Sequence, residues 1–171
     1  VKQPDGSFKE LPKRNVDFGG GLERLASAAI GNRDIFIIDV FDAARAVLEK
    51  HSGKKYQGST LFTRFNLVKN DGADTRSFRI ILDHMRAASI FIASGIRPSN
   101  TEQGYVLRRL IRRSIREADR LGIMEALLAE VAEGFGAAYA DAYPFVQKAT
   151  STIREELEKE EIQFRKTLVH G

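Results

Sequence analysis

The sequence predicts a mainly α-helical, bundle-like fold with a small β remnant near its N-terminus. In one stretch, apolar or small side chains recur at helical spacing, on the face formed by Phe78, Ile81, Leu82, Met85, Ser89 and Ile92. Single glycines follow several such stretches, as expected where helices end. With 43% hydrophobic and 29% charged residues, the composition is that of a globular chain.

The helices are expected over residues 22–30, 35–50, about 74–93, 104–121, 123–141 and 145–168. Their boundaries are marked by Gly31, Gly53, Gly95, Gly122 and Pro144. Asp34 is the expected N-cap of the second helix, and Asp74 or Thr75 that of the third. Residues 15–18 are interpreted as the end of a strand. Residues 53–74 are interpreted as a long connection with a short ordered segment at 61–65.

The composition excludes several kinds of site. The 171 residues contain no cysteine, which rules out a disulfide scaffold, a thiolate zinc site and a cysteine nucleophile. His51, His84 and His170 lack metal-site spacing, so no metal site is expected. His84 lies beside the apolar stripe, and a hydrogen-bonded packing role is the better interpretation.

The N-terminal residues and the hydropathy of the chain indicate whether a signal peptide or a membrane span is expected. The sequence opens on Val1 and a polar stretch, so no signal peptide is expected. The longest apolar stretch, 35–41, is short and contains Asp39, which argues against a membrane span. We therefore expect an internal piece of a longer protein, with no membrane partner.

The helix expected over 104–121 concentrates positive charge. Six arginines lie between Arg108 and Arg120. At ~100° per residue they share one face, and the opposite face holds Leu107, Leu110, Ile111, Ser114, Ala118 and Leu121. Arginine favours bidentate phosphate contacts, and few acids lie on this face, so we expect nucleic acid or phosphate as partner. A solvated or internally salt-bridged face is the alternative. The closing helix mixes acids and bases and predicts only an ordinary solvated surface.

A glycine run joins the expected strand to the first helix, in the sequence Asp17-Phe18-Gly19-Gly20-Gly21-Leu22-Glu23-Arg24. Glycines let a ligand approach the backbone, and a helix N-terminus offers free N–H groups to an anion. Arg24, one turn into the helix, is placed to reach a triphosphate, and Asp17 to hold an ammonium group. No Gly-Lys-Ser/Thr follows, so this is not a P-loop. A plain turn is the alternative.

Together these motifs resemble a known family. Val16-Asp17-Phe18-Gly19-Gly20-Gly21-Leu22-Glu23-Arg24-Leu25 resembles the third signature motif of class II aminoacyl-tRNA synthetases, in the form that the alanyl-tRNA synthetase family carries. Asp83-His84-x-Arg86-Ala87 is similar to that family's next block. Its most recognisable stretch is similar to Pro98-Ser99-Asn100-x-x-x-Gly104-Tyr105-Val106-Leu107-Arg108-Arg109-x-Ile111-Arg112-Arg113. The resemblance covers nearly the whole chain.

The resemblance implies a role for each motif. The family's third-motif arginine contacts the ATP phosphates, which points to Arg24, and its glycines line the adenylate pocket, which points to Gly19 and Gly21. Its aspartate binds the amino group of alanine, which points to Asp17. An asparagine after Pro-Ser, here Asn100, reads a G·U pair in the tRNA acceptor stem. The arginine-rich helix lies along that stem, which points to Arg108, Arg109, Arg112, Arg113 and Arg116.

The resemblance also divides the chain. Residues 1–31 would be the end of the class II catalytic domain, and 32–171 a helical domain that recognises the acceptor stem. It implies a cytoplasmic ligase that uses alanine, ATP and magnesium in the full enzyme. The first and second class II motifs are absent from these 171 residues. We therefore expect the 171 residues alone to be inactive and to bind no ATP. A non-catalytic helical RNA-binding module and a helical domain that binds an acidic protein are the alternatives.

Overall fold

The computed structural model describes residues 2–10, 13, 19–58 and 72–170, with side chains to 168, and it confirms a mainly helical fold. In chain order its elements are α1 (Leu22–Ala29), the 3₁₀ turns η1 (Ile35–Ile37) and η2 (Asp39–Phe41), α2 (Asp42–Ser52), α3 (Ala73–Ala93), α4 (Glu102–Arg120), α5 (Leu128–Ala138), α6 (Pro144–Lys148) and α7 (Thr150–His170).

The expected β remnant is not seen in the described part of the chain. There, β structure is limited to one antiparallel bridge between Lys2 and Phe8. A pair of this size has no further strand to hold it in a sheet. The expected strand end at 15–18 and the expected ordered segment at 61–65 lie outside the described residues.

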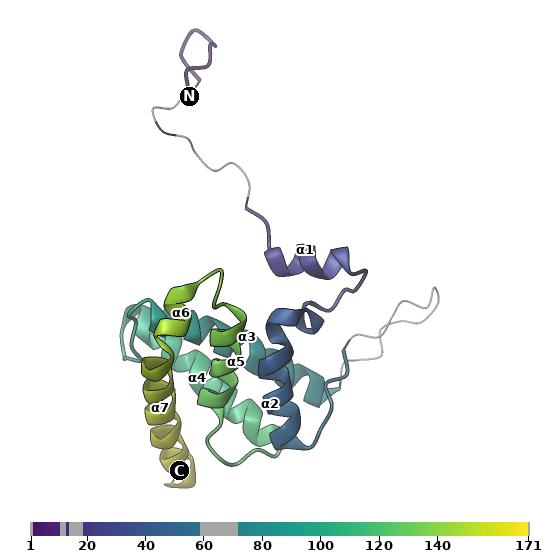
Figure 1. Cartoon of the computed structure of the whole chain (residues 1–171). Coiled ribbons are helices and arrows are strands. Elements are labelled where there is room, and N and C mark those ends of the chain that lie inside the picture. The colour runs from purple at the N-terminus through teal and green to yellow at the C-terminus, as the bar shows by residue number, and fades with distance from the viewer. Residues whose placement is uncertain (1, 11–12, 14–18, 59–71, 171) are drawn as a thin grey trace.

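Helices α2 to α7 pack around one apolar core (Figure 1). The long helices α3 and α4 lie side by side, and α5 contacts α2, α3 and α7. The stripe predicted on α3 is fully buried at Phe78, Ile81, Leu82 and Met85. The core is completed by Phe41, Leu48, Leu107, Ile111, Ile115 and Phe135.

The starts predicted for α2 and α3 are wrong, for tertiary reasons. Asp34 does cap, since its carboxylate accepts the N–H of Phe36 at 3.0 Å, but it opens η1. Ile38 is extended, with ψ at 157°, which separates η1 from η2 where Ile38 and Phe41 are both buried in the core. The α3 N-cap is Gly72, without a side-chain cap.

Asp74 and Thr75, the expected caps of α3, tie it to the segment after α2. Asp74 pairs with Lys54 at 2.8 Å, and the Thr75 hydroxyl donates to the Gln57 carbonyl at 3.1 Å. Several predicted helix ends are confirmed: Gly31, Gly53, Gly95 and Gly122 all take the positive φ that favours glycine. The last two predicted helices become three, because the chain breaks at 139–143 and again at Ala149.

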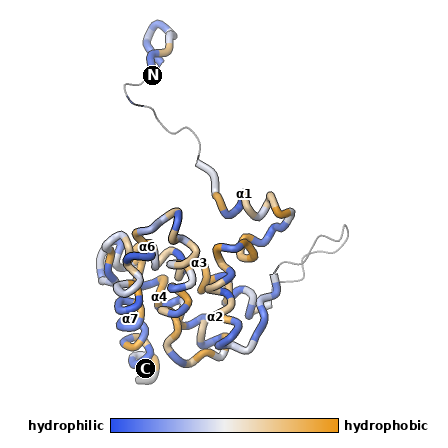
Figure 2. Tube along the Cα trace, viewed as in Figure 1, coloured by the Kyte–Doolittle hydropathy of each residue, from blue (hydrophilic) through white to orange (hydrophobic). Residues whose placement is uncertain are grey.

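Helix α1 lies at the edge of the bundle (Figure 1). Glu23 on α1 forms an ion pair with Arg86 on α3, whose guanidinium lies 5.7 Å from the centre of the Phe41 ring. The opposite side of α1 is apolar and exposed, with Leu22 72% and Leu25 58% accessible. Figure 2 shows this helix as a largely hydrophobic segment outside the core. Over the part of the chain that the structure describes, each helix is too short or too polar to span a membrane.

Candidate functional site

Helix α4 presents the predicted basic face. Leu107, Ile111 and Ile115 are fully buried on its inner side. The basic face is defined here as Arg108, Arg109, Arg112, Arg113, Arg116 and Arg120. The periodicity of the sequence therefore placed this face correctly, because helix geometry alone decides which residues share a side.

Half of these arginines are paired within the protein, unlike the expectation of a face nearly free of acids. Glu160 on α7 is only 7% exposed, and its two carboxylate oxygens contact Arg112 Nε at 2.7 Å and Arg108 Nε at 3.3 Å. Arg120 pairs with Glu117 at 2.8 Å, and the Ser77 hydroxyl donates to Glu117 at 2.7 Å. The closing helix is therefore no ordinary solvated surface, since Glu160 and Glu161 are buried against neighbouring helices.

The other three, Arg109, Arg113 and Arg116, form an exposed triad. All three are exposed, and none makes an ion pair with a carboxylate of the described residues. The Arg109 guanidinium lies over the Tyr105 ring at 5.7 Å, and that of Arg116 over Phe164 at 5.5 Å. An aromatic ring steadies a guanidinium without neutralising its charge. The triad is therefore the part of the basic face that is open to an anion.

Tyr105 lies in the family-like stretch of the sequence, but the sequence predicted no role for it. It is 47% exposed, and at ~100° per residue it falls inside the arc of the arginines. That position on the helical wheel was the available signal. No local signal pointed to Glu160, because it reaches the basic face from α7, 48 positions after Arg112.

Asn100 lies exposed in the loop between α3 and α4, next to the basic face. The Ser99 N–H donates to the Gly104 carbonyl at 3.1 Å, which folds this loop onto the start of α4. A Cβ on Gly104 would lie 2.2 Å from Ser99 Oγ and 2.4 Å from the Arg97 carbonyl oxygen. Glu102 holds a positive φ of 48°, unusual for a residue with a side chain. The loop is thus tightly constrained.

The structure brings Asn100 and Arg108 into direct contact. Arg108 Nη1 donates to Asn100 Oδ1, and Nη2 donates to the Pro98 carbonyl at 3.3 Å. Asn100, Arg108 and Glu160 therefore form one connected polar group at the junction of the loop, α4 and α7.

The glycine run lies at the N-terminus of α1. Gly21 is its N-cap, and no side chain caps the helix. A Cβ at Gly19 would have no described atom within 4 Å, so the backbone there is open. Arg24 is exposed on the first turn of the helix. Asp17, the remaining candidate of this motif, lies outside the described residues.

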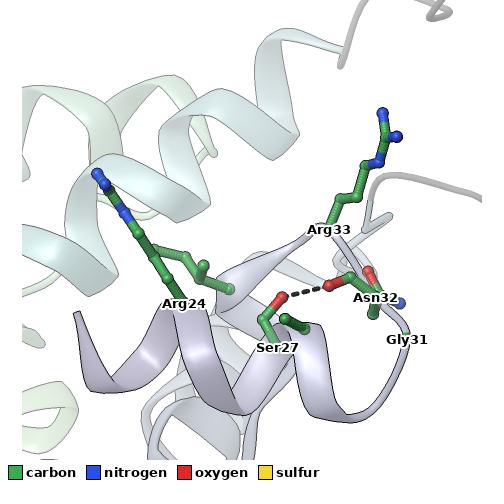
Figure 3. Close-up of a pocket in the computed structure, with 7 residues that line it drawn as sticks. Arg24, Ser27, Gly31, Asn32 and Arg33 are labelled. Atoms are coloured by element: carbon green, nitrogen blue, oxygen red, sulfur yellow. Dashed lines mark hydrogen bonds between the residues drawn. The ribbon is translucent and has the colours of Figure 1, made fainter. Parts of the chain in front are cut away.

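An open pocket of about 370 Å³ lies between α1 and the loop that follows it, lined by Arg24, Ser27, Ala28, Gly31, Asn32, Arg33 and Ile35. The Ser27 hydroxyl donates to the Asn32 carbonyl across its floor (Figure 3). The Arg24 and Arg33 side chains extend from either side of it in different directions (Figure 3). Of the residues predicted in the glycine-run motif, Arg24 lines this pocket, whereas Gly19 and Gly21 do not.

The described residues contain no cluster of metal ligands. Within these ranges, no three His, Asp or Glu side chains are grouped as a metal site requires. His84 is a packing residue, with its ring largely buried and Nδ1 3.4 Å from Asp83, although neither ring nitrogen has a hydrogen bond of good geometry.

Comparison with known proteins gives a consistent result. The model of the family described as tRNA synthetases class II (A) matches residues 1–171. The alanine–tRNA ligase of Chlamydia pneumoniae is 40% identical over 167 residues, which is 98% of this chain and 18% of the relative. That of Nitrobacter winogradskyi is 39% identical over 170 residues, 99% of this chain and 18% of the relative. The chain therefore spans less than a fifth of the length of these relatives.

Proposed function

Because the chain belongs to the class II (A) family of tRNA synthetases, we propose that it is the part of an alanine–tRNA ligase that recognises the tRNA acceptor stem and carries the third class II motif. Residues 1–31 are then the end of the catalytic domain, and 32–171 the recognition domain. The whole enzyme would attach alanine to tRNA at the expense of ATP.

The observation that carries this proposal is the exposed triad beside Asn100. Arg109, Arg113 and Arg116 have no carboxylate partner in the described structure, so they are open to phosphates. Asn100 lies at the end of the same face and carries donors and an acceptor on one short side chain. The minor groove of an RNA helix is wide and shallow, so an exposed amide can enter the groove and contact the edge of a base pair.

The motif on α1 is assigned to the ATP side of the reaction. ATP, when bound, supplies the phosphoanhydride whose cleavage drives attachment of alanine to tRNA. Arg24 is exposed and positively charged, which suits the triphosphate, and the backbone at Gly19 is open to a close ligand. Gly21 leaves the helix N-terminus without a side-chain cap. Asp17 is assigned to the alanine amino group. We assign magnesium no residue, because the described residues contain no cluster of three His, Asp or Glu side chains.

A binding titration tests this function. The probe is an RNA hairpin of an alanine acceptor stem with its G·U pair, compared with the same hairpin carrying G·C, each at two salt concentrations. We expect tighter binding to the G·U form, and binding to both that weakens steeply with salt. Binding to neither hairpin, or equal binding to duplex DNA, would refute an acceptor-stem role. Equal binding to both hairpins would remove Asn100 as the reader and leave the triad as a source of affinity only.

A further inference from the structure

Arg108 differs from the exposed triad in its surroundings. Its side chain is only 23% exposed, and its Nε lies 3.3 Å from a Glu160 oxygen. Its Nη1 donates to Asn100 and its Nη2 to the Pro98 carbonyl. A guanidinium presents its five N–H donors in a fixed planar fork. Nη1 and Nη2 are therefore both hydrogen-bonded within the protein, while Nε is buried near Glu160 without a hydrogen bond of good geometry. Glu160, which Arg112 shares, offsets part of the charge of Arg108.

These contacts decide which way the Asn100 amide faces. Arginine has donors and no acceptor, so the group that meets Arg108 must be the amide oxygen and not the amide nitrogen. The two Nδ2 hydrogens are then directed away from Arg108. Without Arg108, an exposed asparagine amide would be free to turn about its last bond and present either end.

The loop that contains Asn100 is also conformationally constrained. Gly104 leaves no room for a side chain between α4 and the Ser99 segment. The Ser99 hydroxyl donates to the Thr101 carbonyl at 2.9 Å, across the position of Asn100. A recognition group that is ordered before its ligand arrives loses less entropy on binding.

We propose that Arg108 is a positioning residue, which holds Asn100 with its Nδ2 hydrogens outward as donors toward an acceptor atom of the RNA. The inference rests on the proposed function, in which Asn100 reads the acceptor stem. It changes the role of Arg108 from a phosphate contact, as expected from the sequence, to the residue that sets the polarity of the reader.

The first test needs no RNA. The side-chain amide of Asn100 is followed by NMR through its ¹H–¹⁵N heteronuclear NOE, in the unmodified chain and in Arg108→Lys. Lysine keeps the charge beside Glu160 but lacks the planar fork that reaches Asn100 and the Pro98 carbonyl together. We expect an ordered amide in the unmodified chain and a mobile one in Arg108→Lys. The matched control is Arg154→Lys on α7, since Arg154, like Arg108, forms an ion pair with glutamate but makes no contact with Asn100.

The second test uses the two hairpins. Arg108→Lys should lower the preference for G·U over G·C by roughly tenfold, the scale of a lost base contact. Its binding to the G·C hairpin and its salt slope should stay close to those of the unmodified chain. The double variant Asn100→Ala/Arg108→Lys should discriminate no worse than Asn100→Ala alone, since both changes remove one reader. Arg154→Lys should leave the preference intact, and thermal unfolding confirms that each variant is folded.

Several outcomes separate the two claims. If Arg108→Lys keeps both an ordered Asn100 amide and the G·U preference, Arg108 is not a positioning residue. If it weakens binding to both hairpins equally and lowers the salt slope, Arg108 is a phosphate contact, and the inference is again wrong. If the unmodified chain shows no preference, the reading role of Asn100 fails. The NMR comparison then still decides whether Arg108 orders the side chain.

Discussion

At the scale of single residues, the basic face of α4 contains both exposed arginines and arginines that are paired within the protein. Arg113 is exposed and has no carboxylate partner in the described structure, whereas Arg112 lies 2.7 Å from Glu160 and 5.0 Å from the Phe164 ring centre. The two residues are neighbours in the sequence and of the same type, so the local sequence does not distinguish them. What separates them is a helix that follows much later in the chain.

Arg113→Ala should therefore act on RNA binding and Arg112→Ala on folding. Loss of one phosphate contact flattens a plot of log affinity against log salt by roughly 0.7 to 0.9. We expect this change for Arg113→Ala, with unfolding nearly unaffected. Arg112→Ala should lower the midpoint of thermal unfolding and change the slope less. Salt titrations and thermal unfolding of both variants check this, and identical slopes would contradict the division.

Gly104 is the residue on which the Asn100 loop depends most. Alanine there would place a Cβ 2.4 Å from the Arg97 carbonyl oxygen, which is backbone and has no side-chain rotamer to change. Gly104→Ala should destabilise the fold by about 1–3 kcal/mol, the usual cost of overpacking. The control is Gly72→Ala, where a Cβ meets nothing within 4 Å. Denaturant unfolding of both variants measures the difference, and similar stabilities would refute the clash.

At the scale of elements, the sequence predicted helix ends better than helix starts. Gly53 and Gly122 end their helices through a local need for positive φ, which one residue type meets. Helix α5 instead begins at Leu128, whose N–H donates to Glu161 on α7 at 3.0 Å. That partner is 33 positions away, so no window of local sequence contains it. The same holds for the Glu160 contacts of the candidate site.

Glu161 joins α5 and α7 from a buried position. It is 1% exposed and pairs with Arg165 at 3.0 Å, and burial raises the pKa of its carboxyl group despite the Leu128 N–H and Arg165. Glu161→Ala would leave the Leu128 N–H at the start of α5 without its acceptor. Of its ion pairs, the half-buried guanidinium of Arg165 would keep only the one with Asp119. We expect a loss of about 3 kcal/mol, the low end for one partner of a buried pair. Glu155→Ala, at an exposed position of α7, should cost within about 0.5 kcal/mol. Equal losses in denaturant unfolding would contradict this role.

His51 links α2 to the start of α5. Its ring nitrogens lie 2.9 Å from Glu125 and 2.9 Å from Glu130. The hydrogen bond with Glu125 is the main reason that the pKa of His51 is raised above 6.5, with Glu130 adding and burial opposing. The protonated ring therefore stabilises the fold. That contribution is complete below pH 6.5 and is lost as the pH rises through the raised folded-state pKa.

His51→Gln should accordingly destabilise the protein more in mild acid than in base. We expect the difference in unfolding free energy from the unmodified chain to be largest near about pH 5.5 and to shrink by about pH 9. Lys50→Gln removes a charge 3.7 Å from Glu130 without removing an imidazole, and serves as control. A His51→Gln effect that does not vary with pH would show that the link is not a protonated one.

At the scale of the whole molecule, α1 and the bundle meet through few groups. Arg86 contacts both Glu23 on α1 and the Phe41 ring, while Leu22 and Leu25 remain exposed. The sequence predicted α1 and its glycine end correctly, but not the ion pair that attaches it. That pair joins residues 63 positions apart.

These 171 residues should not form alanyl-adenylate. In the proposed function they carry only the third of the three class II motifs, since the two other motifs are not found in the sequence. Positioning of the ATP phosphates supplies most of such chemistry, and in the proposed assignment Arg24 alone leaves that positioning incomplete. We expect no alanine-dependent exchange of pyrophosphate into ATP above a no-protein blank, with a complete alanine–tRNA ligase as positive control. Exchange above the blank that disappears in Arg24→Ala would refute this expectation.

The Glu160 carboxylate, shared by Arg108 and Arg112, also limits how the basic face behaves toward polyanions in general. A face with six uncompensated cations would release many counterions from any nucleic acid that it bound. It would therefore dissociate slowly from each nucleic acid, whatever the sequence. Glu160 and Glu117 offset two of the six positive charges, so the field of the face at long range is weaker. In the proposed function, this smaller charge lets a wrong nucleic acid dissociate more quickly, and it leaves most of the selection to the short-range fit at Asn100.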